Sequence, residues 1–200
     1  SPLLDRFFEN YYRCHPVSAT FVGEHGWDHR LPDYSETSVD EAKARIATLL
    51  TESSGLDLGS LTPDDRHDLR LAQGALRIQD WELSGTHFHR GNPSLYTGEA
   101  VFGLISLFLT DYAPVKERIG AATERLEAVP RLLGQAQTNI ALAPLSWTER
   151  ANRECVGALA LLEDGLPLIA AGRAIESPSF LAAADRARKA MPRGCLTMTT

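Results

Sequence analysis

The feature that most restricts the fold is a continuous apolar segment near the middle of the chain. Residues 95–109 read LYTGEAVFGLISLFL and contain one charged side chain, Glu99. A Gly-Asn-Pro turn precedes the segment, because proline fixes its own φ and disfavours the α region for the residue before it. The segment is shorter than the roughly 20 residues that a bilayer span needs. A helix that is apolar on nearly every side is a buried one, so we predict a buried central helix at about 95–109.

Helical spacing of apolar residues recurs along the rest of the chain, and no segment alternates with the period of two that a half-buried strand requires. The sequence therefore predicts an all-α fold, an irregular multi-helix array around the central helix. A kink or break is expected at Val129-Pro130. His15-Pro16 is expected to end the first helix, and a short apolar run through Phe21 and Val22 follows it. The other helices are expected at about 2–13, 39–50, 62–83, 115–128, 131–141, 148–162 and 178–191.

Composition places the chain among globular proteins: 44% of its 200 residues are hydrophobic and 23% are charged. We expect one helical domain over 1–191 and an unrelated or disordered tail over 192–200. The net charge of −6 argues against nucleic acid as a partner, since phosphate binding needs concentrated Lys and Arg. No apolar run is long enough for a membrane span, and no basic start precedes an apolar stretch, so neither membrane contact nor a signal peptide is expected.

The three cysteines, Cys14, Cys155 and Cys195, are far apart and odd in number. This pattern argues against both a disulfide framework and a thiolate zinc site, and it indicates cytoplasmic residence. Cys155 falls on an apolar helix face and is expected to be a core residue.

The loop at 23–35 is rich in aromatic and titratable side chains. His25 and His29 are four residues apart, a spacing that could bind a metal on one helix face, but Gly26 and Pro32 make a stable helix there doubtful. The alternative is a structured loop in which the histidines and Asp28 bond to nearby backbone. Glu99 also has two interpretations: it stabilises the positive end of its own helix, or it faces a cleft.

Five sequence patterns resemble a bacterial family known as the domain of unknown function 885, over about Leu3 to Phe180. Three resemble its amino-terminal region: Phe7-Phe8-x-x-Tyr11, Pro16-Val17-x-Ala19-Thr20, and Gly23-x-His25-x-x-Asp28-x-Arg30-Leu31-Pro32-Asp33 with Ser35. Two resemble its following helices: Gly91-Asn92-Pro93-x-x-Tyr96-x-Gly98-Glu99-Ala100 and Trp147-Thr148-x-x-Ala151. Members resemble all-α zinc metallopeptidases of the H-E-x-x-H type and are well over twice this length. The resemblance implies that zinc and its ligands belong to a carboxyl-terminal half that is absent here. No H-E-x-x-H motif occurs in this chain, so we expect no metal site, no catalytic residue and no activity of the chain alone.

Two functions follow from these patterns. In the first, the chain is the scaffold and substrate-channel half of a hydrolase-like protein and contacts a peptide or small-molecule ligand. The residues expected to contact the substrate are Tyr96, Glu99, His25 and Arg30. In the second, it is a stand-alone, non-catalytic binding or interaction module. If the chain is part of a larger protein, we expect self-association through exposed apolar surface, or a large apolar groove, near Tyr96 and Glu99, with a contribution from Phe7, Phe8 and Tyr11. A polar surface at this place would favour the stand-alone module.

Overall fold

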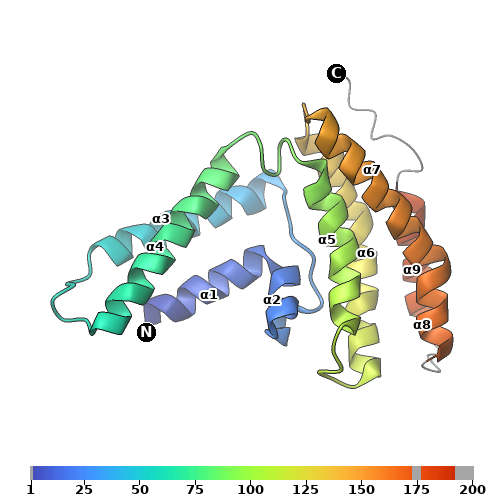
Figure 1. Cartoon of the computed structure of the whole chain (residues 1–200), viewed down its shortest axis with the longest axis horizontal. Helices are drawn as coiled ribbons and strands as arrows, with labels where there is room; N and C mark the ends of the chain where they lie inside the picture. Colours follow the sequence, from blue (N-terminus) through green and yellow to red (C-terminus); the bar gives the residue numbers. More distant parts are fainter. Residues whose placement is uncertain (1, 173–176, 192–200) are drawn as a thin grey trace.

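The computed structural model describes residues 2–172 and 177–191, so the tail expected at 192–200, with Cys195, lies outside the described residues. Within those two ranges the secondary structure is helical and contains no strand (Figure 1). The prediction of an all-α fold is confirmed.

Three helices near the amino terminus form an elongated unit, which we call the arm: α1 (Pro2–Cys14), α3 (Glu36–Ser54) and α4 (Pro63–Ser84). Side-chain caps begin two of them, since Ser35 accepts a bond from the backbone N–H of Ser38, and Thr62 accepts one from that of Asp65. The arm has its own apolar cluster, formed by Phe7, Ile46, Leu49, Ala72 and Leu76.

The remaining helices form a bundle that holds the larger core. They are α5 (Pro93–Ile105), α6 (Val115–Asn139), α7 (Leu145–Ala160), α8 (Leu166–Gly172) and α9 (Pro178–Ala190). A 3-10 turn, η2 (Ser106–Phe108), extends α5, and a π turn, η3 (Leu161–Gly165), joins α7 to α8. Helix α5 packs against both α6 and α7, and α9 packs against α6.

The predicted central helix is buried on one side only. Tyr96, Ala100 and Leu104 lie in the core, whereas Phe102, Ile105 and Leu109 are 40%, 36% and 53% exposed. Phe21 and Val22, at the end of α2 (Pro16–Val22), are also exposed, and the rings of Phe21 and Phe102 lie 5.5 Å apart. We call this surface the apolar face: Phe21, Val22, Phe102, Ile105 and Leu109. Burial of the whole segment is thus only partly confirmed.

The structure differs from the predicted helices in two places. Helix α6 runs unbroken through Pro130, because Pro130 is exposed and the carbonyl that loses its N–H partner can turn toward solvent. The short apolar run after His15 forms a helix that was not predicted: α2 begins with Pro16 at its first position, where a missing N–H costs nothing. Gly23, with φ of 95°, ends α2 in the left-handed conformation that glycine tolerates.

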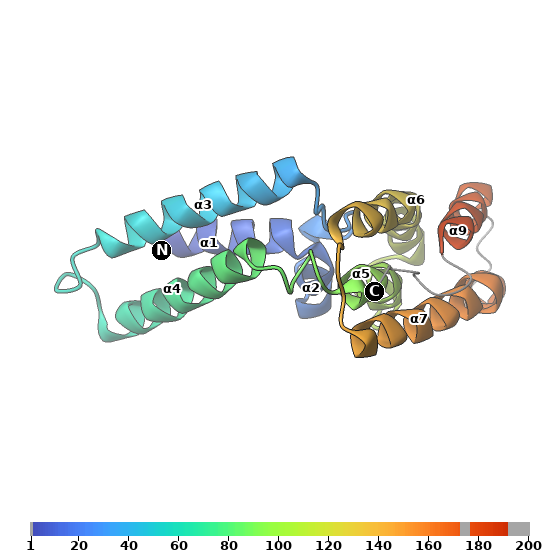
Figure 2. The same cartoon turned by 90° about the horizontal axis from the view of Figure 1, so that it is seen from above.

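The arm and the bundle lie side by side, with α2 at their junction in both views (Figures 1 and 2). A close approach at Gly103 holds this junction together. A side chain there would place Cβ 2.8 Å from Leu31 Cδ2 and 3.2 Å from Val17 Cγ2. The absence of a side chain at Gly103 therefore lets α2 and the loop that follows it pack directly on α5.

Candidate functional site

The loop at 23–35, which we call the strap, is fixed along α6 by side chains that are four residues apart. Arg131 Nη2 donates to the carbonyl of Pro32 at 3.1 Å. Gln135 Oε1 accepts the N–H of Tyr34 at 3.0 Å, and Asn139 Nδ2 donates to the carbonyl of Tyr34 at 2.7 Å. The strap is thus an ordered part of the bundle wall, although it contains only one turn of 3-10 helix, His25–Trp27.

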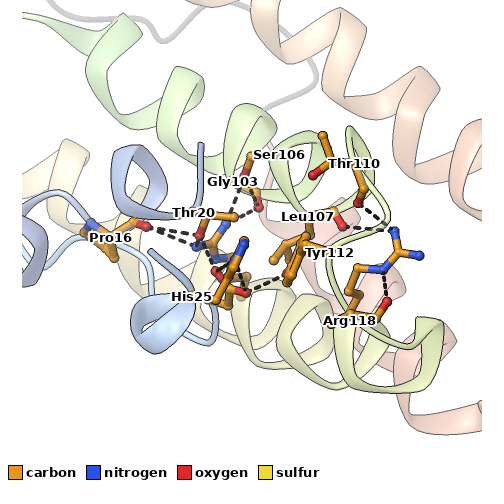
Figure 3. Close-up of polar contacts among 12 residues, drawn as sticks. Pro16, Thr20, His25, Gly103, Ser106, Leu107, Thr110, Tyr112 and Arg118 are labelled. Atoms are coloured by element: carbon orange, nitrogen blue, oxygen red, sulfur yellow. Dashed lines mark hydrogen bonds and ion pairs between the residues drawn. The ribbon is translucent and has the colours of Figure 1, made fainter. Parts of the chain in front are cut away.

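Arg125 is the centre of a polar network buried beneath the strap. Its side chain is 0% exposed and donates to the carbonyls of Gly103 and Pro16 and to the hydroxyls of Ser106 and Thr20 (Figure 3). The contact with Thr20 Oγ1 is 2.6 Å long. Burial lowers the pKa of Arg125 to about 10, with the nearby Asp28 charge opposing the shift. The guanidinium is therefore charged at neutral pH.

Asp28 provides the opposite charge of this network. Its carboxylate accepts from Thr20 Oγ1 at 2.6 Å and from the Tyr112 hydroxyl at 2.6 Å, and it lies 3.0 Å from His25 Nδ1. The rings of His25 and Tyr112 stack with centroids 3.5 Å apart (Figure 3). Burial and the bond to Asp28 both raise the pKa of Tyr112. Among the described residues the Asp28 carboxylate thus bonds to side chains, and it joins the strap to α2 and to the loop that precedes α6.

A cavity of about 430 Å³ lies between the arm and the bundle, and we call it the wedge cavity. Its wall includes strap residues 29–31, 33 and 34 together with His15, Phe88 and side chains of α1, α3, α4 and α6. The volume falls within the range of about 300–1,000 Å³ typical of small-molecule sites. The lining residues used below are Arg13, Arg30, Tyr34, Arg45, Gln79, Glu82 and Arg131.

Two side chains of the cavity wall have buried polar atoms without a hydrogen-bond partner among the described residues. They are the hydroxyl of Tyr34 and the carbonyl oxygen of Gln79, in side chains 5% and 6% exposed. Burial raises the pKa of Tyr34 well above its ordinary value, and the charge of Glu99 adds to the shift. The hydroxyl is therefore protonated and available as a donor, while the amide oxygen is available as an acceptor.

Most arginines around the cavity are neutralised by neighbouring acids. Arg13 pairs with Glu9 at 2.9 Å. Arg45 Nη1 lies 3.4 Å from a Glu41 oxygen, and Arg131 Nη1 lies 3.2 Å from an Asp33 oxygen. These pairs fix the cavity wall rather than leaving charge free for a ligand.

The four predicted substrate contacts do not meet at one site. Arg30 lines the wedge cavity, whereas His25 borders a shallower groove with Tyr112 and belongs to the Asp28 network. Tyr96 is fully buried; its hydroxyl donates to the carbonyl of His89 at 2.6 Å and accepts from Asn139 Nδ2 at 2.9 Å. Burial raises the pKa of Tyr96 to about 12.

Glu99 lies beyond the first turn of its helix. It is the seventh residue of α5, which begins at Pro93, and the influence of the helix dipole is concentrated in the first turn. Its Oε2 is buried without a hydrogen-bond partner among the described residues, and it lines none of the cavities described here. Burial raises its pKa to about 7, opposed by the charge of Arg125.

Sequence reasoning missed Arg125, Tyr112, Gln79 and Glu82. One signal was available for Arg125, because it falls on the stripe of α6 that packs inward at alternating spacings of three and four. A charged residue on such a stripe needs several bonds to offset its desolvation. The stripe consists of Arg118, Ala122, Arg125, Val129, Leu132 and Ala136, all buried.

Comparison with known proteins decides the family. Residues 16–194 match the family described as bacterial protein of unknown function (DUF885). The chain belongs to this family. A search of curated proteins found no match.

One solved structure has the same fold. It is described as that of "a putative lipoprotein of unknown function from Shewanella oneidensis", with 24% sequence identity and a TM-score of 0.82. The similarity covers 94% of this DUF885 chain and 35% of the other, so our chain spans about a third of that protein's length.

Zinc, which the family resemblance implies for a further part of the protein, does not fit the residues described here. No group of three or more His, Cys, Asp or Glu side chains in residues 2–172 and 177–191 is placed to hold a metal ion. In the same residues, no helix is long and apolar enough to cross a bilayer.

Proposed function

We propose that this DUF885 chain is a helical scaffold that forms one wall of a substrate channel in a larger, hydrolase-like protein, where it holds a peptide or small molecule in the wedge cavity. The observation that carries this proposal is the pair of buried, unpartnered groups in the cavity wall, the Tyr34 hydroxyl and the Gln79 carbonyl. A buried polar group without a partner costs about 1–3 kcal/mol. A bound molecule that bonds to both groups would recover this cost.

Under this proposal the chain supplies binding and leaves the chemistry to the rest of the protein. The peptidase-like character of the whole protein rests on the sequence resemblance. Cytoplasmic residence is also part of the proposal, and it is supported by the free thiols of Cys14 and Cys155.

Filling the cavity tests the proposal. Ser38 lines the wedge cavity, and a Ser38→Trp substitution would occupy part of it. We expect small carboxylates, amines and amides that bind the wild-type chain, detected by ligand-observed NMR, to lose binding to this variant. Ser60→Trp, in the exposed loop before α4, is the control and should bind as the wild type does. Equal binding to all three proteins would refute the proposal.

The exposed apolar face favours a second candidate, a stand-alone interaction module that contacts a partner or a second copy through apolar surface. The face joins side chains from α2 and α5. Contiguous exposed apolar surface on a folded monomer commonly marks an interface.

A further inference from the structure

Two charged side chains of the wedge cavity have no ion pair among the described residues: Arg30, on the strap, and Glu82, near the end of α4. The other cavity arginines are paired with acids, as described above. One positive and one negative charge therefore remain, on opposite units of the molecule.

Arg30 is held in place without being neutralised. Its Nε donates to His29 Nε2 at 3.1 Å, and its guanidinium carbon lies 5.4 Å from the centroid of the Trp27 ring. These contacts leave both terminal nitrogens free to form the paired bonds that guanidinium groups make with carboxylates.

Glu82 is partly buried, at the edge of the cavity. Burial raises the pKa of its carboxyl, and the nearby His87 opposes that shift. A cationic ligand group would offset the cost of this desolvation, because a nearby positive charge stabilises the ionised form of a partly buried carboxyl group.

We infer that the wedge cavity recognises a dipolar ligand, a short peptide with free termini, whose carboxylate binds Arg30 and whose ammonium group binds Glu82. This inference rests on the proposed function of the cavity as a binding site. The Tyr34 hydroxyl and the Gln79 carbonyl then bond to a peptide unit, which offers one acceptor and one donor. Recognition of both termini selects short peptides, because a longer chain cannot place both ends in one cavity.

The test is calorimetric titration with three forms of one probe: trialanine with free termini, its amino-acetylated form and its carboxyl-amidated form. We expect each blocked form to bind the wild-type chain about tenfold or more weakly than free trialanine, the usual effect of losing a charged hydrogen bond. The Arg30→Met variant should bind amidated and free trialanine equally well, but it should still bind acetylated trialanine more weakly. Glu82→Gln should show the reverse.

Arg77→Met and Glu36→Gln, which change exposed side chains outside the cavity, are the controls and should discriminate as the wild type does. Melting temperatures of all variants establish that they are folded. Equal binding of the three probes would overturn the dipolar inference and leave the cavity as a binding site. Absence of binding by all three at millimolar concentration would also overturn it. The Ser38→Trp experiment then judges the proposed function separately.

Discussion

At the scale of single residues, the half-buried Glu99 and His15 respond to pH in opposite directions. Burial raises the pKa of Glu99 from 4.5 to about 7 and lowers that of His15 from 6.5 to about 4. Between pH 4.5 and 7 the folded chain keeps a proton on Glu99 that the unfolded chain has lost, so stability falls as pH rises. Between pH 4 and 6.5 the unfolded chain protonates His15 and the folded chain does not, so stability rises with pH.

Glu99→Gln should therefore separate the two effects. Each pKa difference corresponds to about 3 kcal/mol, so in the wild type the two slopes largely cancel between pH 4.5 and 6.5. We expect the variant to be more stable than the wild type by up to about 3 kcal/mol at pH 8. Its free energy of unfolding should rise between pH 4 and 6.5.

The measurement is urea denaturation of both proteins across this pH range. Glu117→Gln, at an exposed position on α6, is the control and should follow the wild-type profile. A Glu99→Gln profile parallel to that of the wild type would show that Glu99 has an ordinary pKa in the folded chain.

Some residue roles could be predicted from the sequence and others could not. Cys155 is buried in the core, as its apolar helix face predicted. Burial shifts the pKa of both Glu99 and His15, and the charge that opposes the shift of Glu99 is that of Arg125 on another helix. A local sequence pattern does not predict these tertiary surroundings. The sequence motif identified Arg30 as a candidate contact. It could not show that the other arginines of the cavity pair with acids while Arg30 does not, because those pairs depend on the fold.

At the scale of elements, α5 provides a direct test of one-sided burial. Leu104 is buried in the core, and its neighbour Ile105 belongs to the apolar face. Leu104→Ala should lower the free energy of unfolding by about 2–5 kcal/mol, because it leaves a cavity. Ile105→Ala removes a similar side chain and should cost less than half as much.

Thermal and urea denaturation of the two variants gives the comparison. Equal losses would mean that another surface covers Ile105 in solution, which a dimer would explain. If only Ile105→Ala lowered the free energy of unfolding, the orientation of α5 described above would be wrong.

Helix starts were the most predictable part of the elements. The pairs Thr62-Pro63 and Ser177-Pro178 each begin a helix, as predicted, because a cap and a first-turn proline act locally. Helix α5 instead begins at Pro93, earlier than the predicted start at about 95, and the Asn92 side chain makes no capping bond. The continuity of α6 through Pro130 was not predictable, since it depends on which side of the helix faces solvent. The packing of α9 against α6 fixes that orientation.

At the scale of the whole molecule, exposed apolar surface was predicted near Tyr96 and Glu99, with Phe7, Phe8 and Tyr11 contributing. Phe7 instead belongs to the arm cluster, while Phe8 is exposed. The apolar face lies on the part of α5 that includes Phe102. The wedge cavity could not be predicted, because it exists only where two separately packed units meet.

The apolar face should make the chain self-associate or bind a hydrophobic dye. Phe102→Gln combined with Ile105→Gln should lower dye fluorescence and shift sedimentation toward the monomer. Val156→Gln, which replaces an exposed apolar side chain on α7, should leave both signals unchanged. A wild-type monomer that binds no dye would show that the face has no partner.

The two apolar clusters share no residue: one lies within the arm, and the other lies in the bundle together with Val17 of α2 and Leu31 and Tyr34 of the strap. Each unit can therefore lose its packing without emptying the core of the other, and cooperativity between them depends on α2, the strap and the polar groups around the wedge cavity. A molecule seated in that cavity would touch both units at once. Binding would then couple the unfolding of the two units. With the ligand bound, the chain would unfold in one cooperative transition, and without it the arm and the bundle would unfold separately.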